Sequence, residues 1–367
     1  MNRLRAVSAL CLCVLAGCRS YPPPGESATP SDLAVLAASA AIDKEPYSAE
    51  PYRRRAKLYQ ARHETGLALA DLKKAAVLDQ ADAILLTAAQ ELDAKNYAVA
   101  ISNSTAALRL NPRLENAFHT RAAAHLALGD LDQAIADARS ALMIEPDFPQ
   151  VLVIRARAFG RKGEFAKAIA DYDRAIELNP RIVEAWYGRG AAYAATGEHQ
   201  RAIDDCTRAI QLNKEVAEAY SARAESWVAL ERVGEALADY DKAVALAPGN
   251  AEYRSNRGAS HQLAKDYDKA LTDFDEALRL NPRLAQAYQN RGMVLVELGR
   301  YDAAIDDLTR AIDLDPSLTL AWYHRSVAWF RQGNLAKAWA DIGESQKRGL
   351  TTPASYLQQL QAASGGK

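Results

Sequence analysis

Prolines recur along this chain at intervals of 34 residues. The series runs Pro112, Pro146, Pro180, Pro248, Pro282 and Pro316. Lys214 stands at the one position inside this series that lacks proline. Towards the N-terminus the series continues with Gln80 and Pro46, and the unit between Gln80 and Pro112 is two residues short. A constant period of this length is the sequence signature of a repeat architecture, in which each unit packs only on its neighbours. The 367 residues are therefore predicted to form one linear array, although length alone would suggest roughly two or three domains.

We number each unit so that the recurring proline is position 32. Other positions of the unit then also keep their residue type. Position 8 is always small, position 20 is alanine, position 27 is alanine or serine, and positions 4 and 11 are frequently aromatic. Glycine stands at position 15 in Gly129, Gly163, Gly197, Gly299 and Gly333. On each side of position 15, the intervals between the small and bulky residues place them on one face of a helix. No stretch alternates apolar and polar residues as a strand does. Each unit is therefore predicted to be a helix, a glycine turn and a second helix ended by proline.

This pattern resembles the tetratricopeptide repeat family over about residues 31–350, nearly nine tenths of the chain. The resemblance implies an all-α fold, a right-handed α-solenoid (superhelix) of about nine helix-turn-helix units. The predicted units are 47–80, 81–112, 113–146, 147–180, 181–214, 215–248, 249–282, 283–316 and 317–350. A half-unit at 31–46 and a short capping helix with a tail at 351–367 are expected to cover the two ends, because an uncovered repeat exposes its core.

The first eighteen residues have the layout of an export signal. A positively charged start precedes an apolar run, residues 6–15, which is too short to span a bilayer. The run ends in Leu15-Ala16-Gly17-Cys18, which resembles the lipobox of bacterial lipoproteins. The resemblance implies a signal peptide at 1–17 and makes Cys18 the mature N-terminus, with a diacylglyceryl thioether and usually a third acyl chain such as palmitate. Several acyl chains give stable membrane attachment, where one chain gives only marginal binding.

Two simpler interpretations of the N-terminus remain open, an ordinary cleaved signal with an incidental cysteine and an uncleaved anchor. Arg19 follows the cysteine, in place of the Asp that retains lipoproteins in the inner membrane of enteric bacteria, and this favours the outer membrane. Residues 18–30 hold four prolines and few residues that could build a core. The twelve residues 19–30 are predicted to form an extended tether that reaches roughly 37 Å at about 3.1 Å per residue.

Arginine at position 7 and aspartate at position 23 recur together. In an antiparallel hairpin that turns near position 15 these two positions lie level, so each pair is predicted to form a salt bridge. The pairs include Arg121 with Asp137, Arg155 with Asp171, Arg189 with Asp205, Arg223 with Asp239, Arg257 with Asp273 and Arg291 with Asp307. Unit 81–112 lacks both partners and has Thr87 and Asn103 instead. Each guanidinium can also bridge to a neighbouring unit. Binding of an anionic ligand is the alternative interpretation.

Composition and motifs argue against catalysis, cofactors and nucleic acid. Lys plus Arg is 45 and Asp plus Glu is 46, so the net charge of −1 leaves no basic excess for a phosphate backbone. The six histidines are scattered over different units, which argues against a zinc site. No GxSxG, HExxH or P-loop motif occurs, and no unit is lengthened by an insertion. Cys206 is interpreted as a core thiol. We therefore predict no enzyme activity, no metal and no cofactor.

The resemblance places ligand contacts on the first helix of each unit, at positions 2, 5, 6, 9, 12 and 13, which line a concave groove. The candidate groove residues are His119, Arg157, Tyr187, Asn256, Gln289, Asn290, Tyr323 and His324. The family's lysine–asparagine–arginine clamp for acidic C-terminal tails is absent, so that ligand class is not expected. Position 2 is Glu184, Glu218 and Glu252 in successive units. These residues either complement the helix dipoles or form an acidic stripe for a basic segment.

Together these features predict a membrane-anchored scaffold or adaptor that binds a peptide segment or a partner helix in the groove. The chain resembles repeat lipoproteins that help to assemble the cell envelope. The expected location is the bacterial envelope, with the protein lipid-anchored, facing the periplasm, and in the outer rather than the inner membrane. Other proteins are the expected partners, and the membrane is contacted only through the N-terminal lipid. The alternatives are a structural spacer without a dedicated ligand and an accessory subunit that positions an envelope hydrolase.

Overall fold

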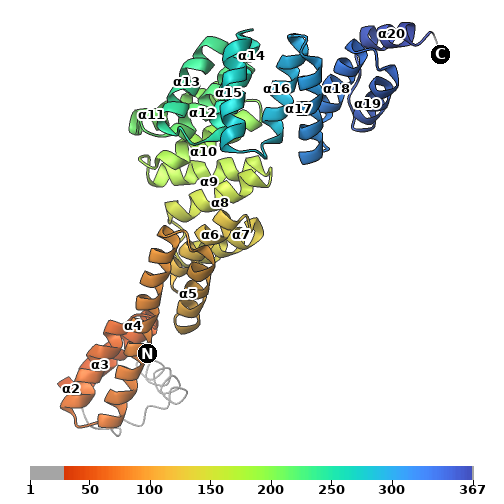
Figure 1. Ribbon diagram of the computed structural model, residues 1–367. Coiled ribbons are helices and arrows are strands. Elements are labelled where there is room, and N and C mark those ends of the chain that lie inside the picture. Colours follow the sequence, from red (N-terminus) through yellow and green to blue (C-terminus); the bar gives the residue numbers. More distant parts are fainter. Residues whose placement is uncertain (1–28, 366–367) are drawn as a thin grey trace, which may run out of the picture. The chain divides into compact units, whose positions relative to one another are not determined.

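The computed structural model describes residues 29–365, so the predicted signal peptide, Cys18 and nearly all of the tether lie outside the described residues. Within that range the chain forms nineteen α-helices, α2 to α20, and no strand (Figure 1). The all-α solenoid prediction is confirmed, because consecutive helices pack as antiparallel pairs. No helix of the described range is both long and apolar enough to cross a membrane. The chain divides after Pro146 into two compact units.

The first unit begins with a single helix that is followed by helix pairs. Its helices are α2 (Pro30–Lys44), α3 (Ala49–Ala61), α4 (Thr65–Asp93), α5 (Tyr97–Leu110), α6 (Glu115–Leu128) and α7 (Leu131–Ile144). Thr29 caps α2 with a reciprocal pair of hydrogen bonds to Asp32, which satisfies backbone donors that a helix start leaves open. Val35, Ala38 and Ile42 are the buried residues of α2, so this helix turns an apolar face towards the first helix pair.

The second unit contains six helix pairs and a closing helix. The pairs are α8 (Pro149–Arg161) with α9 (Phe165–Leu178), α10 (Val183–Ala195) with α11 (His199–Leu212), α12 (Ala217–Ala229) with α13 (Val233–Leu246), α14 (Ala251–Leu263) with α15 (Tyr267–Leu280), α16 (Ala285–Glu297) with α17 (Tyr301–Leu314), and α18 (Thr319–Arg331) with α19 (Leu335–Lys347). The closing helix is α20 (Ala354–Ala363). Each pair is joined by a short turn, and the next pair follows after another short loop.

Helix α4 differs from the predicted pattern. It runs without a break for 29 residues, so the second helix of unit 47–80 and the first helix of unit 81–112 are one helix. The predicted boundary falls at Gln80, inside α4. In most other units proline stands there, and proline ends a helix because it lacks the backbone N–H and crowds the preceding turn. Lys214 lacks this effect too, yet α11 ends before it, so the two-residue deletion, which removes the following loop in unit 81–112, is the feature that sets α4 apart.

The turn inside each helix pair requires a left-handed residue at position 15. Glycine supplies it at five turns, with φ between 73° and 88°. At the other four turns the residue is His63, Lys95, Glu231 or Lys265, with φ between 59° and 62°. A side chain makes this conformation costly, by about 1 kcal/mol or more. The turn geometry is thus set by the helix packing, and glycine is the residue that reaches it without strain.

Small residues at position 8 let the two helices of a pair approach closely. A Cβ added to Gly190 would lie 2.8 Å from Cys206 Sγ, and one added to Gly258 would lie 2.9 Å from the ring of Phe274. Burial raises the pKa of the Cys206 thiol to about 12, in agreement with a core role. These contacts are closer than ordinary packing allows, so a Cβ at Gly190 or Gly258 would force the facing side chain to move.

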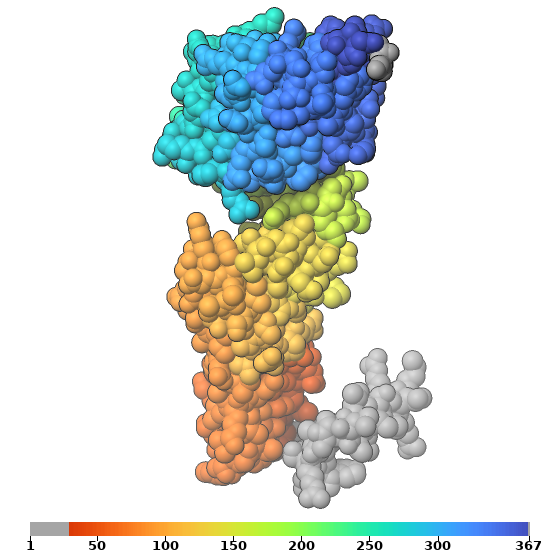
Figure 2. Space-filling model, turned by 45° about the vertical axis from the view of Figure 1, so that its right-hand side comes forward, coloured from red at the N-terminus to blue at the C-terminus, as the bar shows by residue number. Residues whose placement is uncertain are grey.

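Helix α20 closes the C-terminal end of the second unit. Tyr356 and Leu360 are buried against Ala338 and Ile342 of α19. The Tyr356 hydroxyl also lies 2.8 Å from the hydroxyl of Ser326, which is fully buried in α18. In the space-filling view α20, in dark blue, lies directly on the last helix pair (Figure 2). It therefore covers the apolar face that the last repeat would otherwise expose.

Candidate functional site

The position-7 arginines and position-23 aspartates form a bidentate fork in eight helix pairs. In each, arginine Nε and Nη2 donate to the two carboxylate oxygens over 2.6–2.8 Å. The aspartates are only 4–8% exposed. The hydrogen bond that Arg189 donates to Asp205 is the largest influence that raises the pKa of Arg189. All six predicted pairs are among these forks, together with Arg55–Asp71 and Arg325–Asp341.

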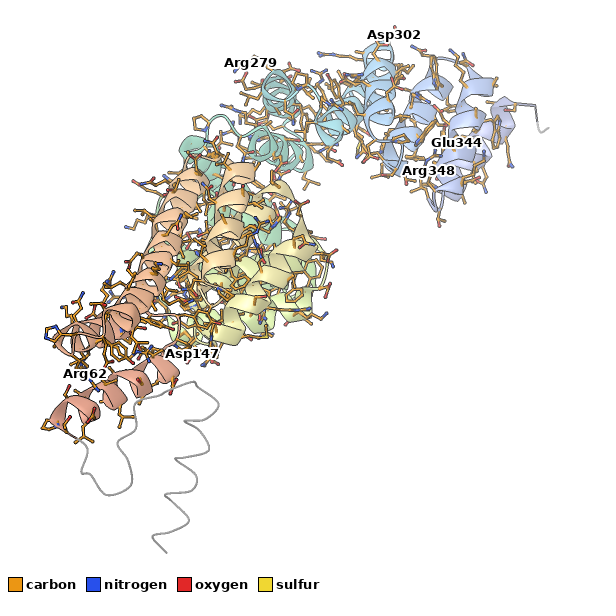
Figure 3. All side chains as sticks on the ribbon, turned by 90° about the horizontal axis from the view of Figure 1, so that it is seen from below. Arg62, Asp147, Arg279, Asp302, Glu344 and Arg348 are labelled. Atoms are coloured by element: carbon orange, nitrogen blue, oxygen red, sulfur yellow. The ribbon has the colours of Figure 1, made fainter. Side chains whose placement is uncertain are left out.

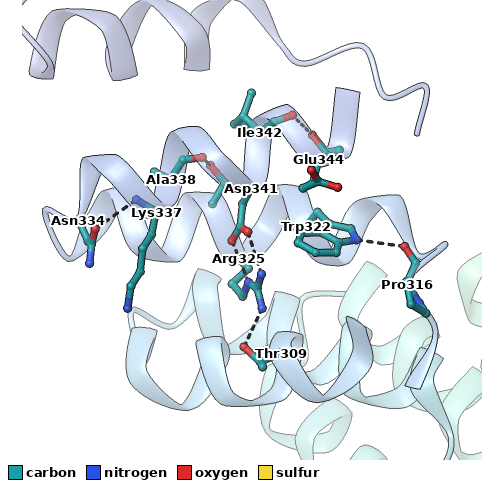
Figure 4. A network of polar contacts seen from close by, with 12 residues as sticks. Thr309, Pro316, Trp322, Arg325, Asn334, Lys337, Ala338, Asp341, Ile342 and Glu344 are labelled. Carbon is teal, nitrogen blue, oxygen red and sulfur yellow. Dashed lines mark hydrogen bonds and ion pairs between the residues drawn. The ribbon is translucent and has the colours of Figure 1, made fainter. Parts of the chain in front are cut away.

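The third arginine nitrogen reaches back to the preceding helix pair. Figure 4 shows this for Arg325, whose Nη1 donates to the Thr309 hydroxyl over 3.0 Å while the fork holds Asp341. Arg223 does the same to Thr207 over 2.9 Å. Because every guanidinium nitrogen in these two networks has a protein acceptor, these arginines have a structural role that accounts for their recurrence without an anionic ligand.

The first helices of the second unit form one continuous face, here called the first-helix face, made of α8, α10, α12, α14, α16 and α18. Each of these helices packs on the next one in the series, with one exception. The exception is the step from α12 to α14, where the two helices pack only weakly. An opening between the side chains of neighbouring first helices is therefore expected at this step.

Three predicted groove residues lie on the first-helix face with accessible side chains. Arg157 is exposed, and Tyr187 and Asn256 are half-buried. Burial is the main cause that raises the pKa of Tyr187, and the Arg157 charge opposes it, so these two side chains lie near each other. Tyr172 of α9 reaches the same place, because its hydroxyl would lie 2.5 Å from a Cβ added to Gly188.

Four other predicted groove residues are engaged within the chain. Gln289 is only 4% exposed and offers almost no contact surface. Asn290 accepts a hydrogen bond from Gln286 over 2.9 Å. The ring of Tyr323 makes edge contacts with His324 and with Tyr356 of α20, at centroid distances of 5.0 and 5.6 Å. The closing helix therefore uses part of the predicted binding surface.

The two histidines of the predicted groove are shielded from water. Burial lowers the pKa of His324 to about 4. Burial also lowers the pKa of His119, which belongs to the first unit and so does not share the first-helix face of the second unit. Both rings are therefore neutral at physiological pH. They provide packing surface and no positive charge.

Glu184, Glu218 and Glu252 stand in the first turns of α10, α12 and α14 and are exposed. Burial raises the pKa of Tyr253 to about 12, and the carboxylates of Glu218 and Glu252 raise it further, so these groups lie together. None of the three glutamates forms an ion pair within the described range. Their place in the first turn agrees with the helix-dipole interpretation, which leaves the acidic-stripe interpretation open.

Exposed charges elsewhere are commonly paired. On α19, Glu344 accepts from Arg348 over 2.6 Å, and the two side chains lie together in Figure 3. This contact, with a second one from Lys347, lowers the pKa of Glu344 to about 2. Arg279 and Glu276 form a similar exposed pair on α15. Lack of an ion pair within residues 29–365 is nevertheless shared by the three glutamates and by other exposed charges of the second helices, such as Lys242, Asp306 and Arg310.

A pocket of about 320 Å³ opens at the weakly packed step between α12 and α14. Its lining residues are Glu225 and Val228 of α12, Tyr240 of α13, and Asn256, Ala259, Ser260 and Leu263 of α14. Sequence reasoning predicted Asn256 but missed Glu225 and Tyr240. The signal for Glu225 was its position 9, where the flanking units have Ala191 and Ala259.

The polar groups of the pocket are a carboxylate, a phenol and an amide. Burial raises the pKa of Glu225, the charge of Glu252 raises it further, and a hydrogen bond with Ser221 lowers it. Burial raises the pKa of Tyr240, which is 3% exposed, and the Glu225 charge raises it further, so the Tyr240 side chain lies near the carboxylate. This site can accept hydrogen bonds and attract positive charge. Among residues 29–365 no group of three or more His, Cys, Asp or Glu side chains is placed to hold a metal ion.

Comparison with known families agrees with the packing. Sequence models of the tetratricopeptide repeat match residues 116–148, 155–217 and 257–321. The chain belongs to the tetratricopeptide repeat family. A solved tetratricopeptide repeat protein from Parabacteroides merdae is 18% identical, with a TM-score of 0.54, and the match covers 68% of this chain and 99% of that one. A chain of the APC/C hetero-tetramer Cut9–Hcn1 is 17% identical, with a TM-score of 0.63, over 91% of this chain and 66% of that one.

At these identities the solved structures show the fold alone. Comparison with curated proteins finds no match. The tetratricopeptide repeat fold is that of protein–protein interaction scaffolds, so a protein-binding role in general follows from family membership. Everything more specific about this tetratricopeptide repeat protein depends on its own residues.

Proposed function

We propose that this protein is a membrane-anchored interaction scaffold that binds a segment of a partner protein on the first-helix face of its second unit. The observation that supports this most is the row of exposed glutamates beside tyrosines on that face. Glu184, Glu218 and Glu252 have no ionic partner in the described range, and the charges of these glutamates act on Tyr187 and Tyr253. Unpaired polar groups beside aromatic area are typical of a binding surface.

The irregularity of the first-helix face also favours a specific ligand over a spacer. A spacer needs only the repeated core and the Arg–Asp forks. This face instead changes from step to step, with Arg157 and Tyr187 at one step and the Glu225 pocket two steps further. Tyrosine combines large area with a polar group at small entropic cost, as binding centres require.

Replacing Tyr187 and Asn256 together with alanine tests the binding face. We expect partner recovery to fall several-fold after crosslinking in intact membranes, while the thermal midpoint changes little because both side chains are half-buried. Lys242→Ala and Arg310→Ala, at exposed sites on second helices, are the controls and should change neither quantity. Loss of the partner in the controls, with recovery unchanged in the double variant, would refute this assignment of the face.

The membrane anchor and the envelope location are the part of the proposal that rests on the N-terminal sequence. Cys18 follows Leu15-Ala16-Gly17, and sulfur is the atom that lipoprotein maturation alkylates. Cys18→Ser should therefore leave unprocessed precursor or unlipidated protein, seen as an altered intact mass and as loss from the detergent phase. If the variant still carried the added mass of the lipid and stayed in the membrane fraction, lipidation at Cys18 would be contradicted. An envelope assembly role for the anchored scaffold then depends on the identity of the captured partner.

A further inference from the structure

The pocket between α12, α13 and α14 contains an acceptor without a partner. Tyr240 is 3% exposed, and its ring packs among Ala224 and Ala236 in the core of its helix pair. Tyr240 lines the pocket, and its hydroxyl forms no hydrogen bond within residues 29–365 but is open to water in the pocket. A ligand that enters the pocket can therefore replace that water and bind the hydroxyl.

Glu225 cannot be explained as a helix-dipole residue. It lies in the middle of α12, away from the first turn where a negative charge is stabilised by the dipole. It is exposed, forms no ion pair in the described part of the chain, and shares a hydrogen bond with Ser221. The like charge of Glu252 acts on it and disfavours its charged form, so a cation placed near both carboxylates would be attracted to them. The electrostatics of the pocket therefore select a positively charged ligand.

The shape and polarity of the lining narrow the ligand further. Val228, Ala259 and Leu263 form an apolar wall, and Leu263 is 57% exposed at the surface. A lysine side chain combines an apolar four-carbon stem with a compact ammonium that has three donors. The stem fits the apolar wall. The ammonium can donate to the Glu225 carboxylate, to the Tyr240 hydroxyl and to the Asn256 amide oxygen, one donor for each acceptor.

We propose that this pocket binds a lysine side chain from a basic segment of a partner protein, with the flanking basic residues near Glu218 and Glu252. The inference rests on the first-helix face being the binding face, and it specifies the chemistry of the partner. The unpaired glutamates on both sides of the pocket favour a segment with several positive charges, which complement the face along its length. The pocket then fixes the register of that segment.

The test measures binding of a defined peptide to the full-length protein in nonionic detergent. The probe is a short fluorescein-labelled peptide in which lysines alternate with Gly-Ser, and its counterpart carries norleucine at every lysine. Fluorescence anisotropy at low ionic strength should detect the lysine peptide, and binding should weaken as salt is added. Norleucine keeps the apolar stem and removes the charge, so its peptide should not bind. Equal binding of the two peptides overturns the proposal.

Glu225→Gln is the decisive variant, because it keeps the shape of the side chain and removes its charge. We expect it to weaken binding of the lysine peptide at least about tenfold, and Tyr240→Phe to weaken it about threefold to tenfold. Glu184→Gln removes the same charge from the same face outside the pocket and should cost much less. Asp306→Asn, an exposed carboxylate on α17, should change nothing. Circular dichroism checks that all four variants keep their fold.

Two results would refute the lysine site. Unchanged affinity in Glu225→Gln would show that the pocket is not used. Equal losses in Glu225→Gln and Glu184→Gln would show general attraction to an acidic surface instead of a pocket. After either result, the proposed binding face would still be supported if partner capture depends on Tyr187 and Asn256. Failure of the lysine site and failure of the proposed function are therefore distinguishable.

Discussion

The Arg223–Asp239 fork is predicted to stabilise one helix pair and to couple it to the preceding pair. Arg223 Nε and Nη2 donate to Asp239 over 2.8 and 2.7 Å, and Nη1 donates to Thr207 of α11 over 2.9 Å. Asp239 is 6% exposed, so water cannot replace the guanidinium if it is removed. Breaking a buried pair from one side costs about 3–5 kcal/mol. Arg223 is about one-fifth exposed, which places the cost near the lower end.

A double-mutant cycle separates the pair from its surroundings. We expect Arg223→Met and Asp239→Leu to cost about 3 kcal/mol each, and the double variant to cost clearly less than their sum, because neither charge is then left alone. Thr207→Ala removes a single hydrogen bond and should cost about 1 kcal/mol. Strictly additive losses for Arg223 and Asp239 would refute the coupling.

The measurement must resolve single repeats, because arrays of repeats unfold in steps and a single free energy of unfolding is then not defined. Amide hydrogen exchange read out peptide by peptide provides this resolution. Protection should fall in α12 and α13 for the single variants, with little change in α18 and α19. The matched control is Arg279→Met, which removes an exposed fork of the same bidentate geometry with Glu276. It should change protection very little, since exposed pairs contribute little.

The remaining predictions concern turns, protonation and the closing helix. Lys265→Gly should raise local stability by about 1 kcal/mol, because φ is 62° there, and Gly197→Ala, at φ 83°, should lower it by a similar amount, both seen in the exchange protection of the flanking helices. Burial lowers the pKa of His324 to about 4, below the unfolded value near 6.5, so the unfolded state takes up the proton first and stability should fall as pH drops from about 6.5 to 4. His324→Gln should remove that part of the slope, and an unchanged slope would contradict it. Leu360→Ala, fully buried in α20, should cost about 2–4 kcal/mol and should reduce exchange protection first at α18 and α19.

The fold was predictable from sequence because its strongest determinants are periodic. Proline follows most second helices, small residues permit close approach within each pair, and a turn residue near position 15 places Arg and Asp side by side. The same logic fails at Gln80, where neither proline nor full loop length is present and α4 continues through the boundary. The left-handed turns at Glu231 and Lys265 follow from packing, and no glycine in the sequence predicts them.

The candidate site was only partly predictable, because it depends on differences between repeats. Asn256 was found from its position on the first helix. The pocket requires α12 and α14 to pack weakly at one step, and it uses Tyr240 from a second helix, where ligand contacts were not expected. Conversely, Gln289 lies at a groove position yet is buried, and Tyr323 is in contact with the closing helix. Position within a repeat predicts which face a residue occupies, but not how far neighbouring helices stand apart.

Site-specific photocrosslinking in living cells tests the central claim most directly. A benzoylphenylalanine residue is placed at Tyr187 or Asn256 on the first-helix face, and at Lys242 or Arg310 on the second helices, in the full-length protein. The account predicts covalent adducts with a partner protein from positions 187 and 256 and none from positions 242 and 310. Adducts from the second-helix positions alone, or none from any position, would contradict a scaffold that binds its partner on the first-helix face.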